Sequence, residues 1–193
     1  LSRSLGMEFA TAAFHNSYYF HKDDNVITNK EEVCGDFEKL INLQLKEKHP
    51  KSWMRAFFNM GLINYIEGSR RMLPCQAGEM NFFVEPYGDI YPCNGLEKKY
   101  WKKSMGNIRE TPNFKEIWEG EQAEQVRQMV RRCPKNCWMV GTASPVMHKY
   151  IKYPLKWALK NKLRSLQGKT ACLDKCWYNV GQDPCQGDLR NKF

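Results

Sequence analysis

The clearest pattern of apolar and polar positions lies between residues 28 and 50. Apolar residues recur there at helical spacing, at Val33, Phe37, Leu40, Ile41 and Leu45. This period predicts an amphipathic helix. Thr28 and Glu31 are spaced as in a capping box, which marks a helix start, and Pro50 closes the pattern. We therefore expect a helix that begins near Thr28 and ends before Pro50.

Two further segments belong to the same half of the chain. Residues 51–67 predict a second helix, with Trp53, Phe57 and Met60 on one side, and Gly68 suits its end. Residues 6–14 form a short and mostly apolar run, which suits a buried strand. The order predicted for residues 1–72 is strand, helix, helix.

The pattern changes character after Pro74. Residues 80–85 are rich in Phe and Val, the run Pro86-Tyr87-Gly88-Asp89 has turn chemistry, and residues 90–92 can return antiparallel. These features predict a β-hairpin. Cys75 precedes the hairpin and Cys93 follows it.

Two helices are predicted after the hairpin. Thr111-Pro112 suits a helix start with Pro at the first position, and one helix then runs toward Cys133. Its apolar residues are Phe114, Ile117, Trp118, Val126 and Met129. A last, basic amphipathic helix is marked by Ile151, Leu155, Leu159, Leu163 and Leu166.

Charge is unevenly distributed along the 193 residues, whose net charge is +9. Eleven Lys and Arg but no Asp or Glu lie between Gln125 and Leu173, which leaves 19 basic and 21 acidic residues elsewhere. A possible anionic partner, such as phosphate, a membrane surface or RNA, would therefore dock at the basic segment 149–169, although such runs are more often solvated faces. The sequence lacks an apolar run of transmembrane length and a secretory signal, so we expect a soluble, cytoplasmic protein. Because it opens with Leu1, we also expect a piece of a longer chain.

The eight cysteines narrow the chemistry further. They are Cys34, Cys75, Cys93, Cys133, Cys137, Cys172, Cys176 and Cys185. Four disulfides would suit a secreted protein, whereas clustered thiols in a reducing compartment usually bind metal. Cys75 and Cys93 bracket the hairpin, and Cys133 and Cys137 form a tight pair. Four thiolates can hold either an iron–sulfur cluster or a structural zinc ion.

The order of these motifs resembles one family over residues 74–138. Cys75, the run Gly88-Asp89-Ile90-Tyr91-Pro92-Cys93, then Gly106-Asn107-Ile108 with Trp118, and finally a cysteine pair resemble the SPASM and twitch domains of radical SAM enzymes. The resemblance implies an auxiliary 4Fe-4S cluster held by Cys75, Cys93, Cys133 and Cys137. A Cys-x2-Cys-x5-Cys portion is absent before Cys133, so one cluster, as in the twitch version, fits better than two.

The resemblance also implies an architecture and a reaction. The fold would be α+β, with residues 1–72 as the end of a partial β/α (TIM-like) barrel and residues 73–193 as the SPASM/twitch-like domain with a basic helical extension. The intact enzyme would cleave S-adenosyl-L-methionine (SAM) to a 5′-deoxyadenosyl radical, with a flavodoxin- or ferredoxin-type electron donor, and peptides are frequent substrates of the family. The chain lacks the Cys-x3-Cys-x2-Cys motif of the SAM-cleaving cluster, so alone it should be inactive.

A rival interpretation is a non-enzymatic zinc module that docks nucleic acid through the basic C-terminal third. The Gly-Asn-Ile and Trp context, and the absence of a familiar zinc-finger spacing, favour the cluster.

Other candidate residues carry weaker signals. Cys172, Cys176 and Cys185 form a possible second metal site, against unligated thiols. Cys34 is expected to be a small packed side chain. His15 and His21 would lie at the end of a barrel strand, where active-site groups gather, or in an ordinary loop. The indoles near cysteines either shield a cluster or pack in a core, and they belong to Trp101, Trp138 and Trp177.

Overall fold

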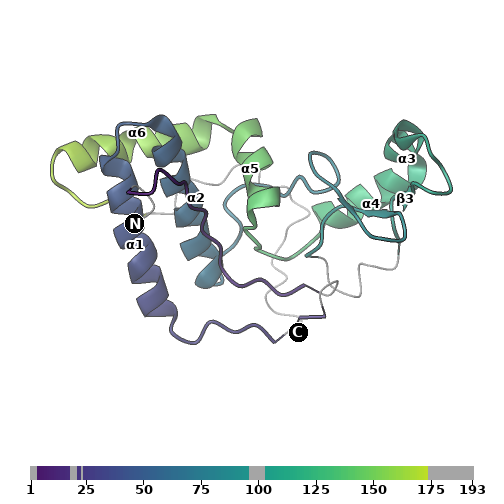
Figure 1. Ribbon diagram of the computed structural model, residues 1–193, viewed down its shortest axis with the longest axis horizontal. Coiled ribbons are helices and arrows are strands. Elements are labelled where there is room, and N and C mark those ends of the chain that lie inside the picture. The colour runs from purple at the N-terminus through teal and green to yellow at the C-terminus, as the bar shows by residue number, and fades with distance from the viewer. Residues whose placement is uncertain (1–3, 18–20, 23, 96–102, 174–193) are drawn as a thin grey trace.

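The computed structural model describes residues 4–17, 21–22, 24–95 and 103–173. Figure 1 shows that they separate into two parts. We call residues 24–73 and 138–173 the helical part, and residues 74–95 and 103–137 the cysteine part. Helices and a small antiparallel sheet together make an α+β arrangement, as the sequence predicted.

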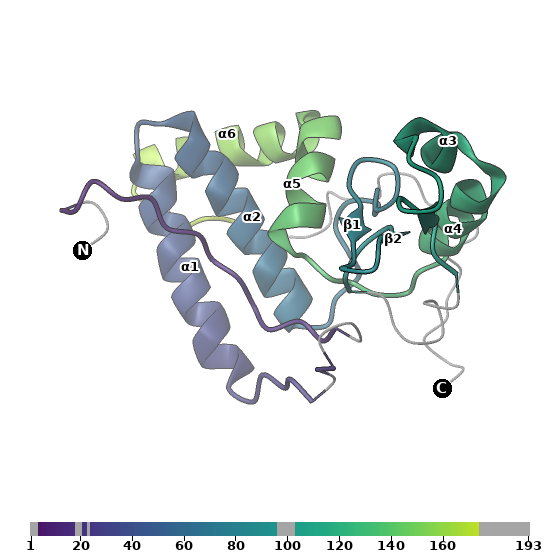
Figure 2. The same ribbon diagram turned by 45° about the vertical axis from the view of Figure 1, so that its right-hand side comes forward.

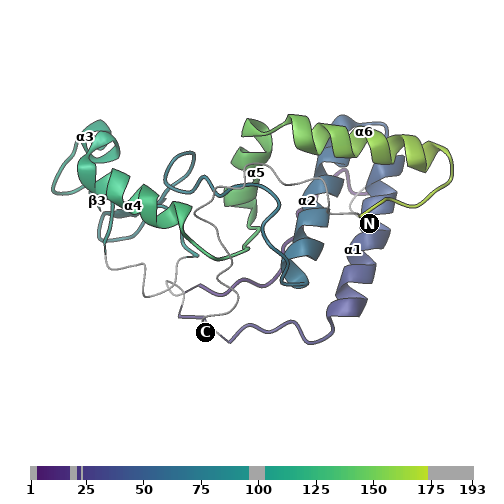
Figure 3. The same ribbon diagram turned by 180° about the vertical axis from the view of Figure 1, so that it is seen from behind.

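The helical part is built from four helices: α1 (Lys30–Lys46), α2 (Pro50–Ile66), α5 (Val140–Lys149) and α6 (Lys152–Leu166). Helices α1 and α2 lie side by side, and α6 packs across both of them (Figures 1 and 3). Three aromatic side chains meet in the core, because the ring of Phe57 lies edge-on to Trp138 at 6.5 Å and to Trp157 at 5.7 Å between centroids. The first two predicted helices are therefore confirmed, and both pack on a shared core.

A close approach between two elements explains one glycine of α2. A Cβ atom on Gly61 would lie 2.1 Å from Nε1 of Trp138, so only glycine leaves room for this indole. Trp138 is 1 % exposed, and its Nε1 donates to the carbonyl of Phe58 at 2.9 Å. The helix thus gives up the better helix former, alanine, in order to seat Trp138, the first residue of the helical part after the cysteine part.

The cysteine part contains a three-stranded antiparallel sheet in the order β1 (Phe83–Val84), β2 (Asp89–Tyr91) and β3 (Gly106–Asn107). Strand β1 pairs with β2 so that Phe83 faces Tyr91, which confirms the predicted hairpin. Strand β3 then adds to the other edge of β2. Helices α3 (Phe114–Glu119) and α4 (Glu121–Arg131) follow, and Figure 2 shows them beyond the sheet as seen from α5.

Three predicted elements differ from the structure. Residues 7–16 form no strand, and Met7, Phe9 and Phe14 are exposed; side-chain contacts, such as Tyr65 Oη donating to the carbonyl of Phe14 at 2.9 Å, hold the segment instead. The single helix expected after Thr111 is two helices, because Gly120 adopts an extended conformation. The first of them begins at Phe114 with Asn113 as its N-cap, and not with Pro112 at its first position.

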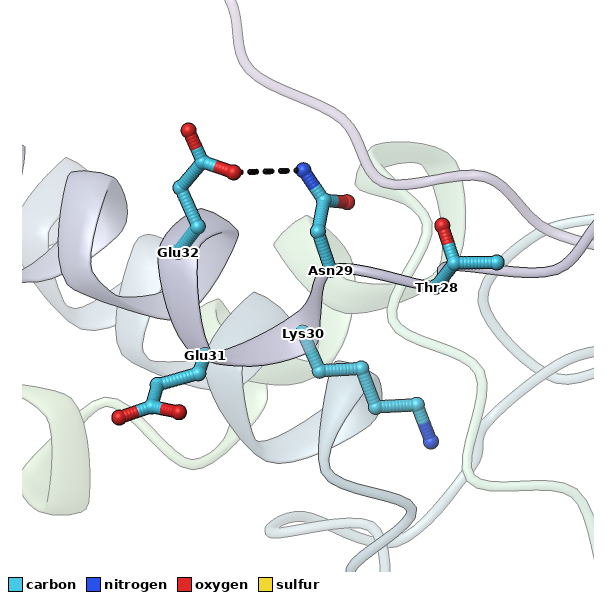
Figure 4. Close-up of a pocket in the computed structure, with 5 residues that line it drawn as sticks. All are labelled: Thr28, Asn29, Lys30, Glu31 and Glu32. Atoms are coloured by element: carbon cyan, nitrogen blue, oxygen red, sulfur yellow. Dashed lines mark hydrogen bonds between the residues drawn. The ribbon is translucent and has the colours of Figure 1, made fainter.

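The start of α1 also differs by one residue. Asn29, not Thr28, is the N-cap, and its side-chain amide donates to Oε2 of Glu32 at 3.0 Å (Figure 4). The observed pair, Asn29 and Glu32, has the same spacing of three residues as the expected pair, Thr28 and Glu31, but lies one position later in the chain. Helix α5 was not predicted at all.

None of the helices in the described ranges has both the length and the apolar character needed to cross a membrane.

Candidate metal centre

The turn of the hairpin positions the segments that carry Cys75 and Cys93. Gly88 has φ +96°, a conformation that side chains rarely adopt, and a Cβ atom there would lie 2.8 Å from Oδ1 of Asn107. The Asn107 amide donates to the carboxylate of Asp89 at 3.1 Å. The Gly-Asp and Gly-Asn-Ile elements are therefore one structural unit, in which β3 supports the turn of the hairpin.

Arg127 of α4 ties the later part of this region to the loop after Cys75. Its Nε donates to the carbonyl of Gly78 at 2.8 Å, and its Nη2 donates to the carbonyl of Trp118 at 2.5 Å. The guanidinium also lies over the Trp118 ring, 4.7 Å from its centroid. Because α4 runs directly into Cys133, these contacts bring the cysteine pair toward the hairpin.

The thiols of Cys75, Cys93, Cys133 and Cys137 are brought into one neighbourhood. Cys93 is buried with Ala77 and Val130, and Cys75 and Cys133 pack against this small cluster. The pKa of Cys93 is raised to about 12, mainly by burial and in smaller part by the negative charges of the other three thiolates. The pKa of Cys133 is raised to about 11, mainly by burial and in smaller part by the charges of Cys137 and Cys75. Burial also raises the pKa of Cys137, and the charge of Cys75 contributes.

These raised pKa values define what the site can hold. Four thiolates close together, one buried and three half-buried, repel one another, so the deprotonated set requires a positively charged group among them. Iron–sulfur clusters and zinc both supply that charge. In the described ranges, no three His, Cys, Asp or Glu side chains group in a geometry for a single metal ion. In kind and number, the four thiols suit a 4Fe-4S cluster and also a structural zinc ion.

Two cationic side chains lie next to the thiols, and sequence analysis singled out neither for this role. Arg71 Nη1 donates to the carbonyl of Cys137 and lies 4.0 Å from its Sγ. Lys135 donates to the carbonyl of Gly95 at 2.8 Å. Both cations lower the pKa of Cys137, against the larger effect of burial. They therefore offset part of the negative charge that the thiolates bring.

Arg71 belongs to the helical part, and besides its bond to Cys137 of the cysteine part it is anchored by contacts within the helical part. Its Nε donates to the carbonyl of Leu73 at 3.0 Å and its Nη2 to the carbonyl of Thr142 at 3.2 Å. The guanidinium lies 5.3 Å from the centroid of the Trp138 ring. No sequence signal marked this residue, because a lone Arg70-Arg71 pair is typical of a solvated surface.

His15 lies against the same loop. Its Nδ1 is 2.8 Å from the carbonyl of Ala13 and its Nε2 is 3.0 Å from the backbone nitrogen of Trp138. The ring must therefore donate at Nδ1 and accept at Nε2, which is the neutral form. Burial is the main reason that its pKa lies below the ordinary value, and the charges of Lys135 and Arg71 lower it further. The ring also stacks on Tyr65, with centroids 4.0 Å apart.

The remaining candidate residues lie elsewhere. Cys34 packs partly buried against the core of the helical part, as expected. His21 is next to Lys22, whose backbone pairs with Ser17. The backbone of Cys172 is bound beside α6, where its N–H donates to Oδ1 of Asn161 at 2.6 Å. Cys176, Cys185, Trp101 and Trp177 lie outside the described residues, so the second metal site stays a prediction.

A surface hollow at the start of α1 is unrelated to this centre. Figure 4 shows the five residues that line it, Thr28, Asn29, Lys30, Glu31 and Glu32, and no cysteine is among them.

Comparison with known protein families identifies the cysteine part. Residues 75–139 match the model of SPASM, an iron–sulfur cluster-binding domain. The match covers about a third of the chain, and it includes Cys75, Cys93, Cys133 and Cys137. Searches of curated proteins and of solved structures gave no match. The expected resemblance to SPASM is therefore confirmed for these residues, and the property that the match supports is iron–sulfur cluster binding.

Proposed function

We propose that Cys75, Cys93, Cys133 and Cys137 ligate a single 4Fe-4S cluster. The observation that carries this proposal is the coincidence of two independent features over the same residues. The SPASM match spans residues 75–139, and within that range Cys75 and Cys133 pack against the buried cluster that contains Cys93. Cys137 lies close enough that its negative charge raises the pKa of Cys93 and of Cys133. Four cysteine ligands leave no open iron position, so the site would not bind substrate directly.

The surrounding residues have defined tasks in this proposal. The bound cluster would supply one-electron redox chemistry. Arg71 and Lys135 would offset thiolate charge, and Arg71 would hold the carbonyl of Cys137 in place. Trp138 and the buried Ala77 and Val130 would exclude water from one side. Such outer contacts set the potential and the stability of metal centres.

We further propose that the chain is the C-terminal part of a radical SAM enzyme. SPASM domains occur in enzymes of that kind, and the proposal assigns residues 1–72 to the end of a partial β/α barrel and residues 73–193 to the auxiliary-cluster region. SAM would be cleaved in a preceding part of the enzyme, with the cluster of this chain as an electron relay or structural clamp. The electron donor would be of the flavodoxin or ferredoxin type, in the cytoplasm, and the substrate class stays open.

The first experiment identifies the metal. Protein purified without oxygen should be brown, with a broad visible absorption band and about four iron and four sulfide per chain. A colourless protein that contains one zinc per chain would contradict the proposed cluster. The measurement is iron, zinc and acid-labile sulfide analysis of the same sample.

The second experiment tests the assignment within the enzyme. The chain alone, incubated with SAM and dithionite, should form no 5′-deoxyadenosine above background, because the Cys-x3-Cys-x2-Cys motif is absent. Protein-dependent formation of this product would show that the SAM-cleaving site lies within these residues and would overturn the proposed division of labour.

A further inference from the structure

The leucines of helix α6 are exposed and do not face the core of the helical part. Ile151, just before the helix, and four leucines of α6 follow one another at steps of four or three residues. All five side chains are exposed: Ile151 (46 %), Leu155 (45 %), Leu159 (47 %), Leu163 (62 %) and Leu166 (72 %). Residues at this spacing lie on one side of a helix. We call these five residues the leucine row.

The buried face of α6 is made by other residues. Pro154, Trp157, Ala158 and Asn161 face the core of the helical part. Figure 3 shows α6 lying across α1 and α2, so its inner side is already occupied. The row was expected to mark the apolar side of this amphipathic helix, which would pack on a core. The structure instead leaves the leucines outside and places Trp157 inside.

A second row of opposite character runs beside the leucine row. Each of the first three residues of the leucine row is followed directly by a lysine, namely Lys152, Lys156 and Lys160. Because one residue turns an α-helix by about 100°, each lysine lies about 100° round the helix from the apolar residue before it. We call these three residues the lysine row. No acidic residue occurs between positions 125 and 173, so nothing on this helix or on α5 reverses the sign of the charge.

We propose that this face of α6 binds the surface of a lipid bilayer that contains anionic headgroups. The helix would lie parallel to the surface, with the leucine row in the boundary between headgroups and acyl chains. The lysine row would extend its flexible side chains to the lipid phosphates. This arrangement is the one that surface-bound amphipathic helices use, and its attraction to anionic lipid comes from the lysines.

Other partners fit these residues less well. A nucleic acid would use the lysines, but its phosphate backbone offers nothing to five exposed aliphatic side chains. A protein partner would favour an apolar centre with aromatic anchors, and lysine is depleted in such interfaces. The aromatic anchor of α6, Trp157, is turned inward. Adjacent aliphatic and cationic rows match lipid chemistry.

The test uses the full chain of 193 residues and two kinds of vesicle. Vesicles of phosphatidylcholine alone are compared with vesicles in which a third of the lipid is phosphatidylglycerol, and the pelleted fraction of protein is measured. We expect binding to the anionic vesicles that weakens at high salt, since screening reduces charge attraction. Binding to the neutral vesicles should be at least about tenfold weaker.

Two double variants separate the rows. Leu159→Gln with Leu163→Gln should weaken binding to anionic vesicles about tenfold or more, because each leucine loses its apolar insertion. Lys152→Gln with Lys156→Gln should weaken it about fivefold for each lysine removed. Matched controls change the same residue types elsewhere. Leu43→Gln alters an exposed leucine of α1, and Lys30→Gln with Lys48→Gln alters two exposed lysines, and each should keep full binding.

All substituted positions are on the surface, and unchanged thermal unfolding would show that each variant folds. The proposal is overturned if the native chain does not bind anionic vesicles, if it binds both kinds equally, or if the leucine variant binds as well as the native chain. It is also overturned if the native chain forms a dimer that the leucine variant abolishes, because the row would then belong to a second copy. Iron content plays no part in these measurements, so failure here is distinct from failure of the proposed cluster.

Discussion

The two parts of the molecule bury very different cores. The helical part packs large aromatic and aliphatic side chains from all four of its helices and from the segments that flank the cysteine part, among them Phe57, Trp138 and Trp157. The cysteine part has one cluster of five buried apolar residues around Ile90 and a second of three, one of which is Cys93. The helical part is therefore held by a large apolar core, whereas the cysteine part has only two small clusters of its own.

Secondary structure strengthens this contrast. The strands of the cysteine part have only two or three residues each. Short strands contribute few ladder hydrogen bonds, and small sheets need further support to be stable. A bound metal group would supply such support, because metal binding and folding are linked where the ligands come from separate segments.

The largest effect is expected from loss of one candidate ligand, which should destabilise the cysteine part and leave the helical part folded. Cys75→Ala, Cys93→Ala, Cys133→Ala and Cys137→Ala should each lose most of the iron and expose residues 74–137 to proteolysis, because a four-ligand site loses a thiolate. Helical circular dichroism from the other part should persist. Iron per chain and limited proteolysis measure the two outcomes.

Cys34→Ala is the control, since Cys34 packs in the helical part, and it should keep its iron. A full cluster in Cys133→Ala and Cys137→Ala, together with its loss in Cys172→Ala and Cys176→Ala, would contradict the ligand assignment. If Cys172, Cys176 and Cys185 hold a second metal, their substitution lowers total metal without abolishing the first cluster.

The next effect concerns the helical part. Gly61→Ala should destabilise the protein by about 2 kcal/mol, although alanine is the better helix former, because its Cβ atom would meet the Trp138 indole. Gly35→Ala in α1 is the matched control, since nothing lies within 4 Å of its Cβ position, and it should stabilise by about 0.5–1 kcal/mol. Denaturant unfolding measures both. Equal effects in the two variants would refute the packing argument.

An effect of similar size should follow at the junction of the two parts. Arg71→Gln removes a guanidinium that donates to three carbonyl groups, and it should cost about 2 kcal/mol. Arg71→Lys keeps the charge but not the planar fork, so it should recover only part of the stability. Arg164→Gln is the control, because Arg164 donates to one exposed carbonyl. If Arg71→Gln and Arg164→Gln unfold alike, Arg71 does not join the two parts.

The smallest effect is a pH dependence at His15. Burial lowers the pKa of His15 from 6.5, so the unfolded chain binds the extra proton more readily than the folded chain. This contribution to stability is present above pH 6.5 and is lost as the pH falls below it. His15→Gln keeps an acceptor without a titratable group. Thermal unfolding from pH 7.5 to 5 should therefore drop further for the native chain than for this variant, and parallel curves would contradict the assignment.

Sequence reasoning succeeded where a pattern was long or carried by special residues. Helices α1 and α2 have sustained apolar spacing, and Gly88 marks the hairpin turn. It failed where an element depends on a partner distant in sequence, or where a residue within the element argues against it. Strand β3 has two residues and exists through pairing with β2, and α5 contains Pro145, which argues against a helix.

The charge pattern was also only partly informative. Three of the eleven basic residues between Gln125 and Leu173 make contacts within the chain. Arg127 donates to the carbonyl of Gly78, and Arg131 pairs with Glu79. Lys162 donates to three carbonyls at the end of α1. The cysteines of the candidate site could be identified from spacing. Arg71 could not, because its contact with Cys137 spans more than 60 residues of sequence. His15 was a candidate from its position, but its contact with the backbone of Trp138 could not be predicted for the same reason.

The contact of Arg71 with Cys137 links two segments that leave the ribosome at different times. The chain leaves the core of the helical part after Leu73 and returns to it at Trp138, so the cysteine part is an insertion whose two ends are fastened together. Lys162 caps α1 only after this insertion has been synthesised. On the ribosome, all four candidate ligands emerge before the residues that complete the helical core. The thiols are therefore accessible to a metal donor while the remainder of the protein is still open.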